Sequence, residues 1–343
     1  MKGELSGPGI IPGLATPPSH LGMYVSPSPS GAFDGFAGAS VSSIRGSGYG
    51  VTDSAALLAP GTSTPSYRAT AGGFGIGGSY DATALFGLPS HQGLLLSGDF
   101  DYARENITLG SLAGLAATSA GSAQTDTYRL GGSVLYRIGG TYVQGTGAFD
   151  FDHGNETQNV DASTGSFNFH GYAADLRLGN IFVLFNSISS SNPGLLTQAP
   201  DPAGGYAVGL DLSGHVGYSN LQFDSFTDSS GFVYGTGTTH TGDAGARARL
   251  FAILPGNGWS WVPYVAATID QEFDFSSSLN IPSQAALAGG DLISLTEAQT
   301  YLGAQLGLDL VGAQGVTVGI NGFYAASSDT KIGGGRIYLK LAL

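Results

Sequence analysis

Thirteen charged side chains fall on the polar faces of strand-like segments, and they are the residues of this 343-residue chain most suited to act on a solute. They are Asp99, Asp101, Arg129, Arg137, Asp175, Arg177, Asp211, Arg247, Arg249, Asp270, Asp309, Arg336 and Lys340. Charged rings that face a water-filled lumen select solutes by charge. Arg and Asp can equally pair across strands and brace an interior. The sequence leaves these two interpretations open.

Other motifs are weaker. The glycines from Gly73 to Gly78 match a dinucleotide fingerprint by letters, but a strand or turn follows them instead of the required helix. The six histidines lack metal-ligand spacing. Asp152 next to His153, and Ser213 near His215, raise the alternative of a membrane hydrolase, although adjacent strand residues point to opposite faces. We therefore predict no catalytic residue, no cofactor and no bound metal.

The element that positions these charges is clearest at residues 299–311. Its odd-numbered positions from Gln299 to Asp309 form a polar, small-residue face, whereas its even-numbered positions from Leu302 to Leu310 are apolar. Side chains alternate across a strand with period two, so this segment has one apolar and one polar wall. That length and pattern suit a tilted strand crossing a bilayer.

Segments of this kind recur along the chain. We expect strands near 33–45, 67–81, 92–105, 126–139, 140–153, 165–179, 180–188, 204–219, 220–235, 241–254, 258–275, 299–311, 315–328 and 331–343. The sequence therefore predicts an all-β fold, a transmembrane antiparallel up-and-down β-barrel. About 14 strands are expected, and 12 is the alternative because the segments 33–45, 180–188 and 220–235 are the weakest.

The connections alternate in length. Tight turns are expected at 138–141, 179–180, 218–221, 255–258 and 312–315. Long polar stretches are expected near 46–66, 106–125, 154–165, 187–203 and 276–298. Outer-membrane barrels have short periplasmic turns and long outer loops, so this rhythm favours the same class.

Aromatic residues on the apolar faces predict contacts with the membrane interface. They are Tyr128, Tyr136, Tyr206, Tyr218, Trp259 and Trp261. Outer-membrane barrels carry such girdles where lipid meets water. The alternative is a soluble β-sandwich with its apolar face turned inward, but its exposed face would carry more Lys and Glu than this chain has.

Composition narrows the function classes. The chain has 57 Gly, 11% charged residues, no Cys and a net charge of −13. Such a charge disfavours nucleic acid as a partner, and the absence of Cys removes thiolate chemistry. Residues 1–32 are rich in Pro, Gly and Ser, so we expect an irregular segment that could plug the lumen, ahead of a barrel spanning 33–343. They lack the apolar core of a signal peptide, which we expect to be absent from this chain.

From about residue 165 the chain resembles bacterial outer-membrane barrels, above all the translocator barrel of autotransporters. The resemblance lies in His170–Gly179, in Gly242–Leu250 followed by Trp261–Val265, and in Thr300–Asp309. It implies a location in the bacterial outer membrane, contact with its lipid, and the barrel-insertion machinery as a partner.

These features predict porin-like passive passage of small solutes through a charged lumen. A translocator or surface-structural barrel that acts through its long outer loops is the alternative. The solute and the oligomeric state are left open by the sequence.

Overall fold

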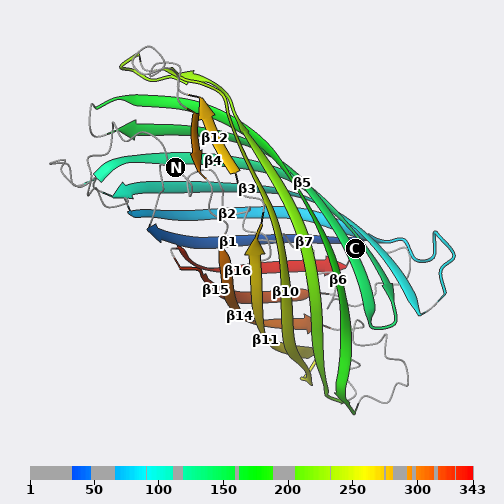
Figure 1. Cartoon of the computed structure of the whole chain (residues 1–343). Coiled ribbons are helices and arrows are strands. Elements are labelled where there is room, and N and C mark those ends of the chain that lie inside the picture. The colour runs from blue at the N-terminus through cyan, green and yellow to red at the C-terminus, as the bar shows by residue number, and fades with distance from the viewer. Residues whose placement is uncertain are drawn as a thin grey trace.

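The computed structural model is an all-β closed barrel of twelve strands (Figure 1). It describes residues 33–47, 66–89, 91–110, 119–158, 162–187, 205–231, 233–273, 276–280, 292–295, 299–312, 316–328 and 330–342. The barrel strands are β1 (Phe33–Ser47), β2 (Ser66–Asp81), β3 (Gln92–Gly110), β4 (Ser119–Ile138), β5 (Thr141–Gln158), β6 (Thr164–Asn186), β7 (Ala207–Phe223), β10 (Gly237–Pro255), β11 (Trp259–Glu272), β14 (Thr300–Gly312), β15 (Thr317–Ala326) and β16 (Thr330–Ala342). Among the described residues there is no helix that could span a membrane.

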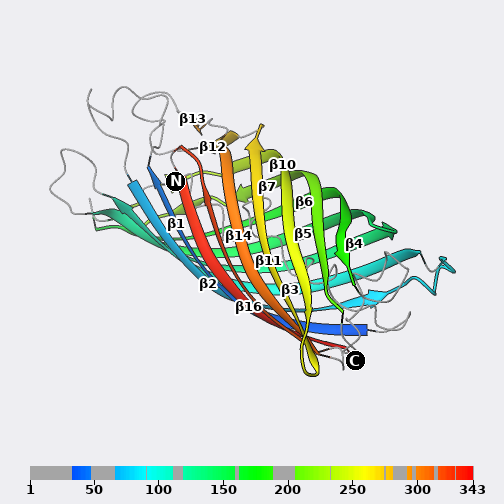
Figure 2. The same ribbon diagram turned by 90° about the horizontal axis from the view of Figure 1, so that it is seen from below.

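The strands follow one another around the barrel, each antiparallel to the next. The wall closes where β16 pairs with β1, from Asp34 opposite Ala342 to Gly46 opposite Thr330. Two short strands, β12 (Ser276–Asn280) and β13 (Leu292–Leu295), extend the sheet beside β10, and β8 (Phe226–Thr227) pairs with β9 (Val233–Tyr234). The first and last barrel strands lie side by side in Figure 2. The predicted up-and-down barrel is confirmed, with 12 strands.

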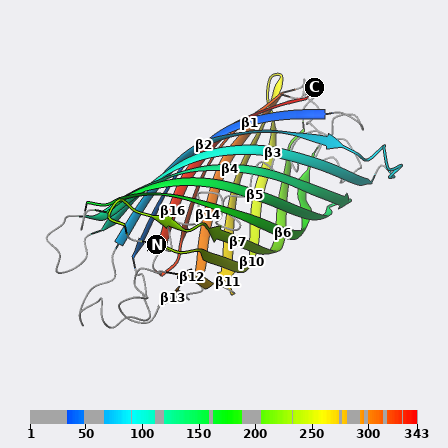
Figure 3. The ribbon, with the colours of Figure 1, turned by 90° about the horizontal axis from the view of Figure 1, so that it is seen from above.

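The strands are tilted, and those of the near and far walls cross in projection (Figure 3). Tilt is what closure of a sheet into a barrel requires. Several strands are also longer than the ~9–11 residues needed to cross a bilayer: β4 has 20 residues and β6 has 23. The predicted polar stretches 106–125 and 154–165 are therefore largely strand, and they extend the wall beyond the membrane.

Two of the predicted turns are wrong. Residues 179–180 lie inside β6, so the expected strands 165–179 and 180–188 form one strand. Residues 218–221 lie inside β7, so the expected strand 204–219 continues into the first part of 220–235, and the last part of 220–235 contains β8 and β9. Gly179 faces the ring of Tyr142 on β5, and a Cβ at this position would overlap that ring. This glycine therefore serves close packing instead of a turn. The end of β6 at Asn186 and the start of β7 at Ala207 consequently lie at the end of the barrel that carries the tight turns.

The outward face changes character along each strand. In the first half of β4 the outward side chains are polar: Ser122, Gln124 and Asp126. From Tyr128 to Ile138 the large outward side chains are apolar or aromatic. Tyr128 and Ile138 are ten residues apart, which matches one tilted crossing of a bilayer. Exposed apolar side chains cover the same band on the other strands, including Ile76, Leu176, Leu306 and Ile337. The outer face thus has an apolar band with a polar margin toward the longer connections.

Ser219→Pro tests the assignment of 218–221 to a strand. Ser219 pairs with Ala173 on β6 and Thr241 on β10, so both sides of the backbone are in the ladder. Proline has no N–H and would leave a ladder carbonyl unpaired, at a cost of about 1–3 kcal/mol. We expect a lower temperature for loss of the heat-resistant, fast-migrating form on gels. Ser63→Pro, in the connection between β1 and β2, is the control, and equal behaviour of the two variants would contradict the assignment.

Candidate functional site

The candidate site is the inner wall of the barrel. All thirteen charged residues predicted from the sequence lie on the face opposite the exposed apolar band. Eight of them are buried, namely Arg129, Arg177, Asp211, Arg247, Arg249, Asp270, Asp309 and Lys340, and the other five are half-buried. Because buried charges require partners, the question is which groups these side chains contact.

The best-defined ion pair joins β4 to β5. Arg129 donates from Nε to Asp150 Oδ1 at 2.5 Å and from Nη2 to Asp150 Oδ2 at 2.8 Å. Their side chains are only 8% and 2% exposed. Arg129 also stands opposite Asp101 on β3, so a cation lies between two carboxylates around the wall. The two-point Arg–carboxylate geometry fixes both side chains.

A second ion pair lies at the seam that closes the barrel. Lys340 Nζ on β16 is 2.7 Å from Asp34 Oδ2 on β1, and both side chains are buried. The last strand is therefore joined to the first by a charge pair as well as by the backbone ladder. The two strands at which the barrel closes are thus also joined by an ion pair that faces the interior.

His215 on β7 contacts two carboxylates. Its Nε2 lies 3.1 Å from Asp243 Oδ2 and 3.5 Å from Asp270 Oδ1. His153 instead lies on the outer face of β5, with Nδ1 2.8 Å from Asn168 Oδ1. The two histidines considered for hydrolysis are thus on opposite sides of the wall. Within the described ranges, no group of His, Asp and Glu side chains is arranged to hold a metal ion.

Tyrosines bind two of the inner carboxylates. Tyr142 donates its hydroxyl to Asp211 Oδ1 at 2.9 Å, and Tyr338 donates to Asp309 Oδ1 at 2.6 Å. The guanidinium of Arg249 lies 3.7 Å from the centre of the Tyr264 ring, a cation–π contact. Of these contacts, the hydrogen bond from the Tyr338 hydroxyl fixes the position of the Asp309 carboxylate.

Each inner aromatic ring of this group lies over a glycine of the neighbouring strand. The ladder places Tyr142 opposite Gly179, Tyr264 opposite Gly307, Tyr338 opposite Gly319, Phe251 opposite Gly209 and Phe36 opposite Gly77. In all five pairs a Cβ on the glycine would overlap the ring. The glycines thus let the rings lie flat against the wall and let the tyrosine hydroxyls reach the carboxylates.

Acidic and basic groups alternate around the wall. Arg129 separates Asp101 from Asp150, and Arg249 stands opposite Asp211. The printed ion pairs therefore join oppositely charged groups of neighbouring strands. Among the described residues, the inner wall presents more carboxylates than cations.

Sequence reasoning did not identify several partners of the inner charges. They are Asp34, Asp150, Asp243, Tyr142, Tyr264 and Tyr338, and His215 was considered only for hydrolysis. Their inward direction follows from the same period-two alternation that located the thirteen charges. Asp150, for example, has the parity of Tyr142 on β5. Which cation each would meet depends on strand register, which alternation does not give.

The predicted interface aromatics lie on the outer face. Tyr136, Tyr206, Trp259 and Trp261 lie near the tight-turn end, whereas Tyr128 and Tyr218 lie toward the other end. Tyr128 belongs to a row of outward rings that pair in the ladder, Phe74, Tyr102, Tyr128 and Phe151. The ring centroids of Phe74 and Tyr102 are 5.5 Å apart, and those of Tyr102 and Tyr128 are 5.3 Å apart.

A closed wall with a lipid-facing apolar band and a polar, charged interior defines an outer-membrane β-barrel. Residues 46–322 match the autotransporter beta-domain family, and the chain belongs to that family. It is located in the bacterial outer membrane. Short turns face the periplasm in such barrels, so the end that carries the turns 139–140 and 256–258 is periplasmic.

Solved structures of autotransporter barrels are similar in fold. The translocator domain of NalP from Neisseria meningitidis is 14% identical, with a TM-score of 0.59, covering 91% of this chain and 88% of that one. The transport unit of AIDA-I from Escherichia coli is 13% identical, with a TM-score of 0.60 and 90% coverage of both chains. The beta domain of Bordetella BrkA is 14% identical, with a TM-score of 0.58, covering 91% and 100%. No curated protein sequence matches.

Gly179→Ala tests the ring-over-glycine packing. The added methyl group would push the Tyr142 ring off the wall and away from Asp211. Overpacking of this kind costs about 1–3 kcal/mol, so we expect a lower temperature for loss of the folded form on gels. Gly145→Ala is the matched control on β5, because a Cβ there meets no atom within 4 Å. The packing account fails if Gly179→Ala is as stable as Gly145→Ala.

Proposed function

We propose that the barrel is a narrow passage for hydrophilic material across the outer membrane, and that it passes small charged solutes. The observation that carries the proposal is the contrast between the two faces of the wall. Large apolar side chains cover the outer face, whereas the inner face carries charged and hydroxyl side chains together with buried apolar clusters, the largest of which includes Leu135, Phe251 and Val262. A polar inner wall lowers the cost of moving a hydrated solute through the bilayer.

The inner pairs would limit such a passage. Arg129–Asp150 and Lys340–Asp34 reduce the charge available to a solute and occupy space inside the wall. The excess of inner carboxylates, which include Asp99, Asp175 and Asp309, favours cations over anions. The expected passage therefore has low conductance and prefers small cations.

Planar-bilayer recordings test solute passage. We expect small cation-selective steps from the full chain, and larger steps from Arg129→Ala/Asp150→Ala, which removes the two-point pair from the inner wall. Arg104→Gln/Asp126→Asn removes an equivalent pair from the outer face and should leave conductance unchanged. If the full chain, the Arg129/Asp150 variant and a chain without residues 1–32 all fail to conduct, solute passage is wrong.

Membership of the autotransporter beta-domain family favours a second function, translocation of a polypeptide segment. The barrel wall begins at Phe33, at the periplasmic end, so a segment fused ahead of the barrel has the lumen mouth nearby. An extended hydrophilic polypeptide would meet the same polar wall as a small solute. The two functions differ in the size of what crosses.

An epitope fused ahead of Met1, behind an export signal, distinguishes them. Translocation predicts that protease added to whole cells removes the epitope while the barrel stays heat-resistant. The same epitope fused to an unrelated periplasmic protein should stay protected. An epitope that remains protected in cells with a folded barrel contradicts translocation.

We further propose that the barrel-insertion machinery of the outer membrane assembles this chain, as the family implies. The expectation that the chain is not an enzyme stays a prediction. It would be contradicted by hydrolysis that is lost on substitution of His153 or His215.

A further inference from the structure

Three exposed cations stand side by side on the outer face of the barrel. Arg45 on β1 lies opposite Lys331 on β16 and opposite Arg68 on β2. All three side chains are exposed. We refer to Lys331, Arg45 and Arg68 as the basic row.

The basic row crosses the seam where the barrel closes. Like charges directly opposite each other on neighbouring strands repel and destabilise the sheet. Within the part of the chain that the structure describes, none of the three forms an ion pair. These two adjacent like-charge pairs form a cationic surface that favours binding of an anion.

The row lies beyond the apolar band, on the extracellular side. On β1 the outward residues run from exposed Val41 through Ser43 to Arg45. On β16, Lys331 is the next outward residue after Gly333, which pairs with the exposed Tyr324 of β15. On β2, Gly72 and Thr70 separate Arg68 from the exposed Phe74, so on all three strands the row lies on the headgroup side of the apolar band.

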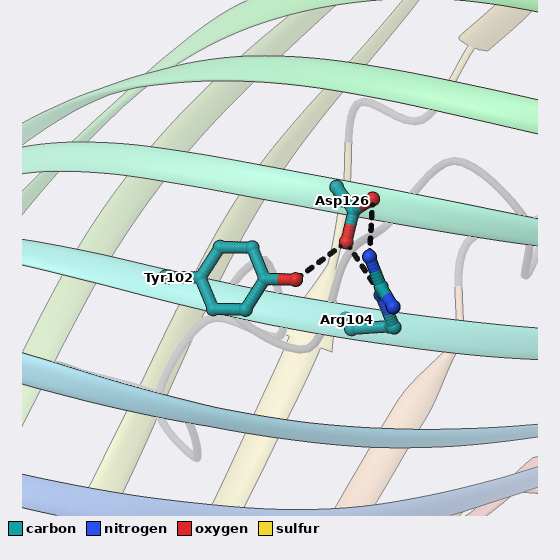
Figure 4. A network of polar contacts seen from close by, with 3 residues as sticks. All are labelled: Tyr102, Arg104 and Asp126. Carbon is teal, nitrogen blue, oxygen red and sulfur yellow. Dashed lines mark hydrogen bonds and ion pairs between the residues drawn. The ribbon is translucent and has the colours of Figure 1, made fainter.

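A fourth outward cation at this margin shows the contrasting case. Arg104 is the next outward residue after Tyr102, and it binds Asp126 through Nε at 2.7 Å and Nη2 at 2.9 Å. Tyr102 donates its hydroxyl to the same carboxylate at 2.7 Å (Figure 4). Arg104 is thus paired with a carboxylate on the same face, whereas none of the described carboxylates forms an ion pair with the basic row.

We propose that the basic row binds the phosphate groups of the glycolipid that forms the outer leaflet of the membrane. Arg binds phosphate through two parallel hydrogen bonds, and Lys binds it as a point charge. The row spans two strand spacings, ~10 Å, which suits a headgroup carrying more than one phosphate. Bound phosphate would also remove the repulsion across the seam.

The test measures the apparent Kd of the full, folded chain for lipopolysaccharide in zwitterionic micelles at fixed low salt. Each basic residue near a membrane surface contributes about fivefold to binding of anionic lipid. We therefore expect Arg45→Gln/Arg68→Gln/Lys331→Gln to bind on the order of a hundredfold more weakly. Arg45→Lys/Arg68→Lys keeps the charge and should retain most of the affinity. Arg104→Gln/Asp126→Asn, which leaves the net charge unchanged, should bind as the unmodified chain does.

Thermal loss of the folded form on gels gives a second readout that a folding defect does not imitate. Without lipopolysaccharide, the triple Gln variant should be at least as heat-stable as the unmodified chain, because repulsion is relieved. With lipopolysaccharide, the unmodified chain should gain more stability than the variant. The proposal is overturned if the triple variant keeps full affinity. It is also overturned if phosphatidylglycerol at matched phosphate content, or inorganic phosphate alone, binds as tightly as lipopolysaccharide.

Discussion

The whole structure depends on one constraint: inside a bilayer every backbone N–H and C=O must find a partner within the protein. A sheet meets this requirement only when it has no edge. Closure between β1 and β16 runs from Asp34 to Gly46 on one strand, so the seam is as fully paired as the rest of the wall. Once the wall is closed, period-two alternation sends every second side chain to lipid and every other one to the interior.

The interior then sets a packing problem that the outer face does not have. Charged side chains and large rings lie close together in the interior. Each buried charge therefore requires an oppositely charged or hydrogen-bonding partner, and each large ring requires a small residue beside it. The Arg129–Asp150 pair answers the first need. Tyr142 answers both, because its ring lies over Gly179 while its hydroxyl reaches Asp211. Repetition of this arrangement at Tyr338, Gly319 and Asp309 indicates a general way of filling the wall.

The faces of the barrel could be predicted from the sequence because alternation is local. The inward direction of Asp309 and the outward direction of Leu306 follow from a few neighbouring letters. The number of strands could not be predicted from the sequence in the same way. The Gly179-Asn180 pair is typical of a turn, and only the ladder partner Tyr142 shows that Gly179 lies inside a strand. The same limit applies to the charges. Asp309 could be assigned to the interior, but its contact with Tyr338 depends on the register of β14, β15 and β16.

The cations on the two faces of the wall differ in the groups that neutralise their charge. Arg129 and Lys340 point inward and meet carboxylates of neighbouring strands. Arg104 points outward and meets Asp126 on the same face. Arg45 points outward between two further cations, at the polar margin of the apolar band. Like charges opposite each other on neighbouring strands repel, and the proposed binding of an outer-leaflet phosphate at this row would relieve that repulsion.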